Sequence, residues 1–153
     1  RARGLKWNRT GIIWWNMLDC WPQISDAVVD YYFEKKIAFH YLKRVQTPVL
    51  VFMSEQEGWN HRLLISNDTR NGVDVRLTVT EGDTGEPVVE TSCFVPAGEN
   101  LEVQKIRVIP GEQRLYLIKW VVNDQSFSNH YITGFPPYDK NKAKEWLRKI
   151  MEL

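Results

Sequence analysis

The chain has 153 residues and a formal net charge of +1 at pH 7, with 43% hydrophobic and 25% charged residues. This length is enough for one ordinary domain with a core, and the composition is typical of a soluble globular protein. A charge so close to zero argues against nucleic acid and a membrane surface as partners. We find no signal peptide or transmembrane run, and the start at Arg1 rather than Met suggests a piece of something longer.

The tryptophans concentrate at one end of the chain. Four of the seven, Trp7, Trp14, Trp15 and Trp21, fall within the first 21 residues. The run Gly11–Trp15 is apolar and rich in β-branched and aromatic residues, which predicts a short buried strand followed directly by polar residues. In a barrel of parallel strands the functional side chains lie at such strand ends, where the ring of Trp15 could present an apolar face to a sugar.

A helical pattern follows the tryptophan-rich loop. Ser25 and Asp26 are candidate N-caps, and the spacing of Phe33, Ile37 and Tyr41 predicts a helix over residues 30–44. Pro48 prevents the helix from continuing.

From Pro48 the hydrophobic period changes from helical to alternating. The candidate strands are Val49–Met53, Arg62–Asn67, Val73–Thr80, Val88–Phe94, Leu101–Val108, Arg114–Val122 and Ser126–Thr133. Short strands separated by turn signals every 8–12 residues or so predict an immunoglobulin-like β-sandwich. Residues 115–122 are apolar on both faces, which predicts a central strand. Asp139 is expected to cap a final helix, whose apolar stripe is Ala143, Trp146, Leu147 and Ile150.

The sequence carries no pattern for a metal or cofactor. His40, His61 and His130 are isolated and no CxxC or HExxH occurs, so neither is predicted. Cys20 and Cys93 are expected to be buried free thiols rather than a disulfide. Two stretches match the N-glycosylation sequon, at Asn8 and Asn67, which is a weak signal.

The stretch Gly11-Ile-Ile-Trp-Trp-Asn-Met-Leu-Asp-Cys-Trp-Pro22, followed by Asp30-Tyr-Tyr32 and Lys36-Ile-Ala-Phe-His-Tyr-Leu-Lys-Arg44, resembles the end of the catalytic barrel in glycoside hydrolase family 2. The β-mannosidase-like branch is the most similar. The resemblance is specific over residues 4–45 and architectural beyond them. It implies a mainly β fold, in which a strand-loop-helix remnant of a (β/α)8 barrel precedes the sandwich and a short helix follows it. The expected boundaries are 1–46 for the barrel end, 47–136 for the sandwich and 137–153 for the C-terminal helix.

The resemblance also implies a retaining exo-β-glycosidase, with a β-mannoside as the candidate substrate. Its two catalytic glutamates, about 5–5.5 Å apart, would lie on earlier barrel strands, so no catalytic residue is expected in this chain. Trp15, Asp19 and Trp21 fall on the positions that bind substrate in the family. Asn16, where Gln is common, together with Cys20 and Pro22, departs from the β-mannosidase pattern and leaves the sugar open.

Other interpretations of these residues remain open. Trp15 could be a core residue, Trp21 could plug a barrel, and Trp14, on the opposite strand face, is expected in the core. Asp19 is expected to fasten the loop by accepting backbone N–H bonds more than to hold a sugar hydroxyl. Asp26 and Asp30 are expected at a helix start.

The expected partners are a carbohydrate substrate, the remainder of a catalytic barrel and, for this piece alone, a second copy. The alternative function is a carbohydrate-binding or protein-interaction sandwich, for which a row of exposed aromatics would be the sign. The candidates are Tyr116, Trp120, Phe127 and Tyr131, whose alternation fits a core equally well. By default the sandwich is expected to be a structural spacer. The sequence does not fix the compartment, although an extracytoplasmic location, secreted or periplasmic, is slightly favoured over a cytoplasmic one.

Overall fold

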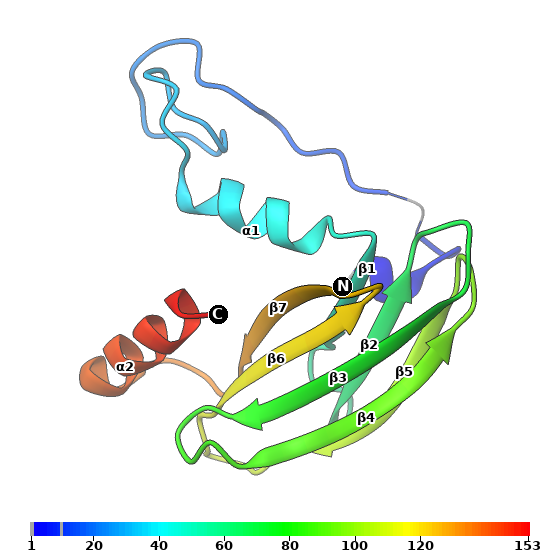
Figure 1. Cartoon of the computed structure of the whole chain (residues 1–153). Coiled ribbons are helices and arrows are strands. Elements are labelled where there is room, and N and C mark those ends of the chain that lie inside the picture. The colour runs from blue at the N-terminus through cyan, green and yellow to red at the C-terminus, as the bar shows by residue number, and fades with distance from the viewer. Residues whose placement is uncertain (1, 10) are drawn as a thin grey trace.

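The computed structural model of the chain describes residues 2–9 and 11–153. Over these residues the elements are the short 3-10 helix η1 (Arg3–Leu5), helix α1 (Ile37–Val45), the strands β1 (Val49–Met53), β2 (Asn60–Asn67), β3 (Val73–Glu81), β4 (Pro87–Val95), β5 (Asn100–Arg107), β6 (Leu115–Val122) and β7 (Gln125–Ile132), and helix α2 (Lys140–Met151). Figure 1 shows two sheets facing one another, with α1 and α2 outside them. None of the described helices is long and apolar enough to cross a membrane.

The strands form a sandwich of three strands against four. One sheet has the order β1-β2-β5 and the other β4-β3-β6-β7, and every pairing is antiparallel. The mainly β, immunoglobulin-like class predicted from the sequence is therefore confirmed, and each predicted strand exists with ends shifted by two residues at most. β6 lies inside its sheet, as its two apolar faces predicted.

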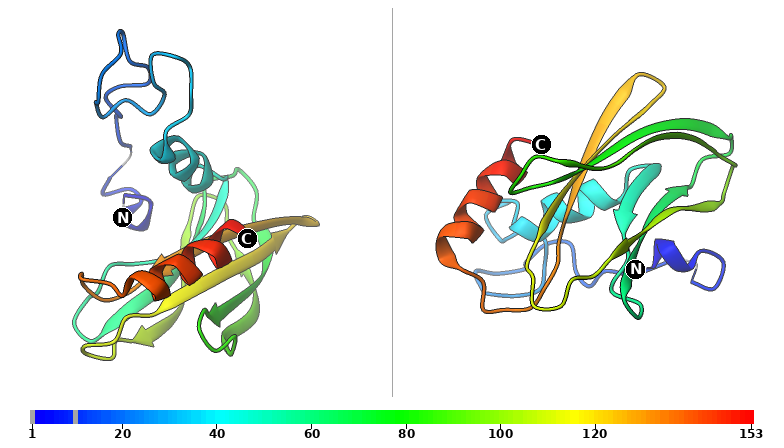
Figure 2. Two further views of the ribbon diagram at one scale, coloured as in Figure 1. Left: turned by 90° about the vertical axis from the view of Figure 1, so that its left-hand side faces the viewer. Right: turned by 90° about the horizontal axis from the view of Figure 1, so that it is seen from below.

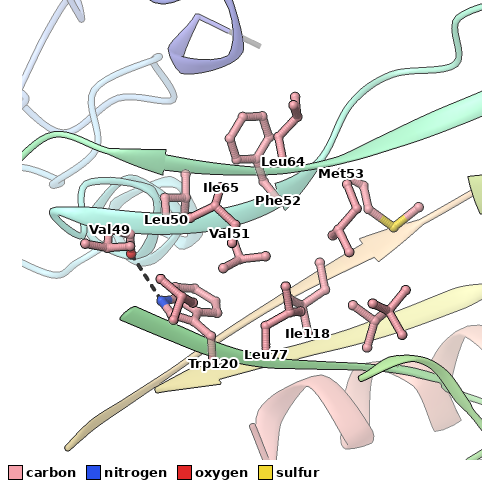
Figure 3. Packing of buried hydrophobic residues seen from close by; sticks show 14 of the residues in the cluster. Val49, Leu50, Val51, Phe52, Met53, Leu64, Ile65, Leu77, Ile118 and Trp120 are labelled. Atoms are coloured by element: carbon pink, nitrogen blue, oxygen red, sulfur yellow. Dashed lines mark hydrogen bonds between the residues drawn. The ribbon is translucent and has the colours of Figure 1, made fainter. Parts of the chain in front are cut away.

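The core lies between the two sheets and is closed by buried side chains of both. Val51, Ile65, Val75 and Ile118 are completely buried in it. Trp120 packs among them, and its indole Nε1 donates to the carbonyl of Val49 at 3.2 Å, which joins the two sheets (Figure 3). The indole N–H of a buried Trp needs such a partner, so this bond fixes how β6 faces β1.

Helix α2 packs on the outer face of the four-stranded sheet, over β6 (Figure 2). The side chain of Asp139 accepts hydrogen bonds from the backbone N–H groups of Asn141 and Lys142, both at 2.9 Å, and so caps the helix as predicted. Trp146 and Ile150 pack on Leu115 of β6 in a small second cluster. The predicted apolar stripe is only half buried, because Ala143 and Leu147 face solvent.

The predicted strand Gly11–Trp15 does not form. Residues 11–36 instead run as an irregular excursion that extends beyond α1, away from both sheets (Figures 1 and 2). A strand needs hydrogen-bonded neighbours, and the described residues offer Ile12 and Ile13 none, so both side chains are exposed rather than buried. The expectation of a buried strand was wrong for this chain.

The predicted helix over residues 30–44 begins at Ile37 instead. The Asp30 carboxylate accepts from the backbone N–H groups of Tyr32 and Glu34, both at 2.9 Å, which makes a tight turn rather than a helix start. Phe33 in that turn has a positive φ of 66°, which a helix cannot include. Asp26 does not begin a helix either, because α1 starts eleven residues later.

Candidate functional site

The candidate site is the excursion that carries Trp15, Asp19 and Trp21. Its two arms are held together by backbone hydrogen bonds: Val29 N donates to Met17 O at 3.0 Å and Asp19 N donates to Val29 O at 3.1 Å. These bonds make a one-residue parallel bridge between Leu18 and Val29. The backbone N–H of Lys36 closes the base by donating to Val28 O at 3.0 Å.

Asp19 is the buried centre of this excursion, with 2% of its surface exposed. Its Oδ2 forms an ion pair with Lys36 Nζ at 2.8 Å, and its Oδ1 accepts from Ser25 Oγ and from Gln23 Nε2. The hydrogen bonds from Lys36 and Ser25 hold the pKa of Asp19 below its ordinary value of 3.8, against the opposing effect of burial. Asp19 therefore fastens the loop, as expected, although through side-chain donors rather than backbone N–H groups.

Trp15 and Trp21 point the other way, into solvent. Trp15 is 78% exposed and Trp21 is 61% exposed, and no ring contact joins them among the described residues. The structure thus places the buried Asp19 in a cluster with Lys36, Ser25 and Gln23, which we call the Asp19 knot, and leaves both tryptophan rings exposed. Within this chain neither Trp is a core residue. Trp14 was expected in the core but is half exposed, and its Nε1 donates to Asp26 O at 3.3 Å.

Asn16 stands between the exposed and buried sides of the excursion. The peptide bond between Trp15 and Asn16 is cis. The side-chain Oδ1 of Asn16 is buried and accepts no hydrogen bond from any residue in the described ranges. A buried acceptor without a donor is uncommon in a folded protein.

A polar clamp ties the excursion to the sandwich at its two ends. The Arg3 guanidinium donates to the carbonyls of Val45 at 2.8 Å and Thr47 at 2.7 Å, so it grips the end of α1. The same group forms an ion pair with Asp68 at 3.0 Å, and Lys6 pairs with Asp68 as well. Contacts between the first residues and the sandwich therefore cross the boundary expected near residue 46.

The sequence missed the residues that build the Asp19 knot. The sequence pattern predicts Ser25 as a helix cap and gives no structural role to Lys36 or Gln23. Their donors lie four, six and seventeen residues after Asp19, at spacings that match no single regular element. The only signal in the sequence was Asp19 itself, an acidic residue in an apolar stretch. Such a residue needs a hydrogen-bonding or charged partner when it is buried, but the pattern does not identify that partner.

The aromatic residues that would have indicated a carbohydrate-binding sheet face lie in the core instead. Tyr116 and Trp120 are buried, and Phe127 and Tyr131 pack against the same cluster. That expected sign of the alternative function is therefore wrong for these four residues.

Three smaller expectations can also be compared with the structure. Cys20 and Cys93 are free, as expected, although neither is fully buried. The Asn67 sequon is not usable in the folded chain, because Asn67 is completely buried and its amide donates to three backbone carbonyls, those of Asn71, Val95 and Pro96. Asn8 is exposed, while Thr10 of its sequon lies outside the described residues. No group of acidic, His and Cys side chains that could hold a metal occurs in the described ranges.

The fold and the site together define a class: an immunoglobulin-like sandwich that carries an aromatic-rich excursion on a buried ionic knot. No family model matches the chain. It is 41% identical over 51 residues to β-mannosidase B of Aspergillus terreus, a match that covers 33% of this chain and 6% of that protein. A second match, to β-mannosidase B of Thermothelomyces thermophilus, is 33% identical over 69 residues and covers 45% of this chain and 8% of that protein.

The fold has a solved counterpart. The β-D-mannosidase from Dictyoglomus thermophilum superimposes with a TM-score of 0.62 over 80% of this chain and 16% of that chain, at 18% identity, which speaks for the fold alone. The two sequence matches confirm the resemblance to β-mannosidases over a third to just under half of this chain. The chain matches only a small part of each of these proteins.

Proposed function

We propose that the chain is the C-terminal portion of a retaining exo-β-glycosidase, with a β-mannoside as the candidate substrate. In this proposal the excursion supplies an aromatic wall to the active site, the sandwich carries the excursion, and the catalytic glutamates come from the rest of the barrel. The observation that carries the proposal is that Trp15 and Trp21 are exposed on the same excursion in which Asp19 is buried and ion-paired with Lys36. The similarity to β-mannosidase B supports it.

The exposed apolar side chains of the excursion support the proposal, because another part of the parent protein would cover them. Ile13, Ile24 and Phe33 are all strongly exposed, beside Trp15 and Trp21. Each large apolar side chain that becomes covered contributes about 1.5–3 kcal/mol. The remaining strands and helices of a barrel would cover the aliphatic part of this surface and would supply a donor for the buried Oδ1 of Asn16.

The tryptophans fit a role in binding rather than in bond making. An indole offers a flat apolar face on which the C–H groups of a pyranose ring can pack, and it carries no group that transfers protons near neutral pH. Cleavage with retention needs two carboxyl groups about 5–5.5 Å apart. Asp19 cannot serve as one of them, because both its oxygens are engaged within the loop.

Kinetics of the intact parent enzyme test the proposal. Trp15→Ala should lower kcat/KM on an aryl β-mannoside roughly 10- to 100-fold, because it removes about 1–3 kcal/mol of apolar contact with the sugar. Phe94→Ala, which removes an exposed aromatic ring from β4 of the sandwich, is the matched control and should leave kcat/KM unchanged.

The 153-residue chain alone should not hydrolyse a panel of aryl β-glycosides. Turnover by the purified chain would refute the assignment of the carboxylates to another part of the parent. A folded Trp15→Ala parent with full kcat/KM would remove Trp15 from the substrate site.

A further inference from the structure

The sandwich has a cavity at the opposite end of β1 from its junction with α1. It has a volume of about 630 Å³ and lies between the β1–β2 turn, the β5–β6 loop and the segment after β7. Its lining includes Trp59, His61, Arg107, Tyr131 and Phe135. Its volume lies within the range that holds small organic ligands. None of these residues belongs to the excursion.

Two exposed aromatic rings line the cavity, and hydrogen bonds hold the backbone that carries them. Trp59 is 66% exposed and Phe135 is 81% exposed. The carbonyl of Trp59 accepts from Val108 N at 2.9 Å, and Gln113 Nε2 donates to the carbonyl of Phe135 at 2.6 Å. Because the loops are held by these bonds, a ligand that packs on the rings need not order the backbone first.

Polar groups converge on the same cavity. His61 is buried, and its Nδ1 donates to the carbonyl of Ser54 at 2.9 Å, so Nε2 is the ring nitrogen that remains for a ligand. Burial raises the pKa of Tyr131, which keeps its hydroxyl protonated as a donor. The guanidinium of Arg107 forms no ion pair with any residue of the described ranges, so its donors are available.

We propose that this cavity is a binding site for a neutral pyranose sugar, separate from the excursion. A pyranose has an apolar C–H face for Trp59 or Phe135 and vicinal hydroxyls for Arg107 and His61, and the cavity presents both kinds of surface. Glu55 and Glu112 of the lining are balanced by Arg107 and Arg114, so the formal charge of the lining favours neither an anionic nor a cationic ligand. The proposal rests on the proposed function only for the choice of sugar used as the probe.

A binding experiment on the 153-residue chain tests this site. A β-1,4-linked mannotriose is titrated into ¹⁵N-labelled chain, and the indole N–H signals of the seven tryptophans report where it binds. We expect saturable shifts at the Trp59 indole and at the backbone of Arg107 and Gly134, with the Trp15 indole unaffected. Mannitol, an acyclic polyol without a ring face, serves as the ligand control and should give no saturable shift.

Single substitutions test which side chains of the cavity contribute to mannotriose binding. Trp59→Ala should weaken mannotriose binding at least about tenfold, and Arg107→Gln, which keeps the stem length but removes the guanidinium, should weaken it as well. Phe94→Ala is the matched control, because Phe94 is an exposed aromatic residue of β4 that lies outside both the cavity lining and the excursion.

Absence of saturable binding, shifts confined to Trp15 and Trp21, or a Trp59→Ala chain that is folded and binds normally would each overturn the site. None of these results bears on the kinetics of Trp15→Ala in the parent, so failure here and failure of the proposed function are distinguishable.

Discussion

Asp19 shows at the scale of one residue what a sequence can and cannot say about a site. A carboxylate in an apolar stretch predicts a buried structural role or a ligand contact, and the structure gives the structural role. The identity of its partners was not predictable, because Lys36 and Gln23 reach it only after the loop has folded back between them. Trp15 and Trp21 were predicted as candidates through the resemblance to the glycosidase family. Their exposure was not predictable, since a strand pattern presupposes neighbouring strands.

The Asp19–Lys36 ion pair should control the order of the excursion. In Lys36→Met the carboxylate of Asp19 stays buried without its cation, which is more damaging than the loss of an exposed pair. We expect the tryptophans of the excursion to become more accessible to acrylamide, measured by fluorescence quenching, while the near-ultraviolet signal of the buried Trp120 persists.

Lys43→Met is the matched control, because Lys43 lies on α1 with its side chain exposed and makes the same change in charge. Equal quenching in the two variants would contradict the role of the knot.

At the scale of elements, alternation was a better guide than helical periodicity. All seven strands were predictable, because the residues that alternate inward also form the closed core between the sheets. Helix α1 was predicted seven residues too long because Phe33 fits its apolar stripe. Local turn chemistry at Asp30 overrides that periodicity, since a side-chain acceptor two residues from a free N–H competes with the helix.

Helix α1 is attached to β7 through a histidine, and this attachment should depend on pH. Arg44 Nη1 donates to His130 Nδ1 at 2.9 Å, so the neutral ring is required, and Tyr41 Oη lies 3.5 Å from Nε2. Burial, and after it the charge of Arg44, lowers the pKa of His130 from 6.5 to about 4. Protons therefore bind the unfolded chain more readily, and the stability contributed by this group is complete above pH 6.5 and is lost as the pH falls toward 4.

Urea unfolding across this pH range measures the effect. We expect the free energy of unfolding to decline from pH 6.5 to about 4 in the wild-type chain and to decline less in His130→Gln, which cannot titrate. His40→Gln, an exposed histidine of α1, is the control and should follow the wild type. Identical slopes for His130→Gln and the wild type would show that the α1–β7 contact does not titrate.

Across the whole molecule, the apolar surface divides into a closed part and an open part. The sandwich buries most of its apolar side chains between the sheets, although Trp59, Phe94 and Phe135 are exposed at its surface. Residues 11–36 and helix α1 expose most of their large apolar side chains. Exposed apolar patches of this kind favour association between molecules. The sequence predicted this surface as apolar, but it could not predict that the excursion would stay away from the sandwich, because no local pattern encodes a missing neighbour.

We therefore expect the isolated chain to self-associate in a concentration-dependent way. Sedimentation velocity over a range of concentrations should show a shift from monomer to larger species. Replacing Ile13 and Ile24 by Asp should shift it back, because charged side chains oppose burial of the patch. The matched control is an exposed aliphatic pair on the sandwich side, Ile109 and Ile132, replaced in the same way. A wild-type chain that stays monomeric at every concentration would contradict this expectation.

The Arg3 clamp gives the excursion a property that concerns its length rather than its chemistry. Because Arg3 grips both Val45 and Thr47, the chain leaves the sandwich and comes back to it at nearly one point. The free energy of closing such a loop rises only with the logarithm of its length, by about 0.6 kcal/mol for each doubling. Segments much longer or shorter than residues 7–44 could therefore replace this part of the chain between the same two anchors. The sheets would keep their strand register, so the sandwich should tolerate large changes in the length of this segment.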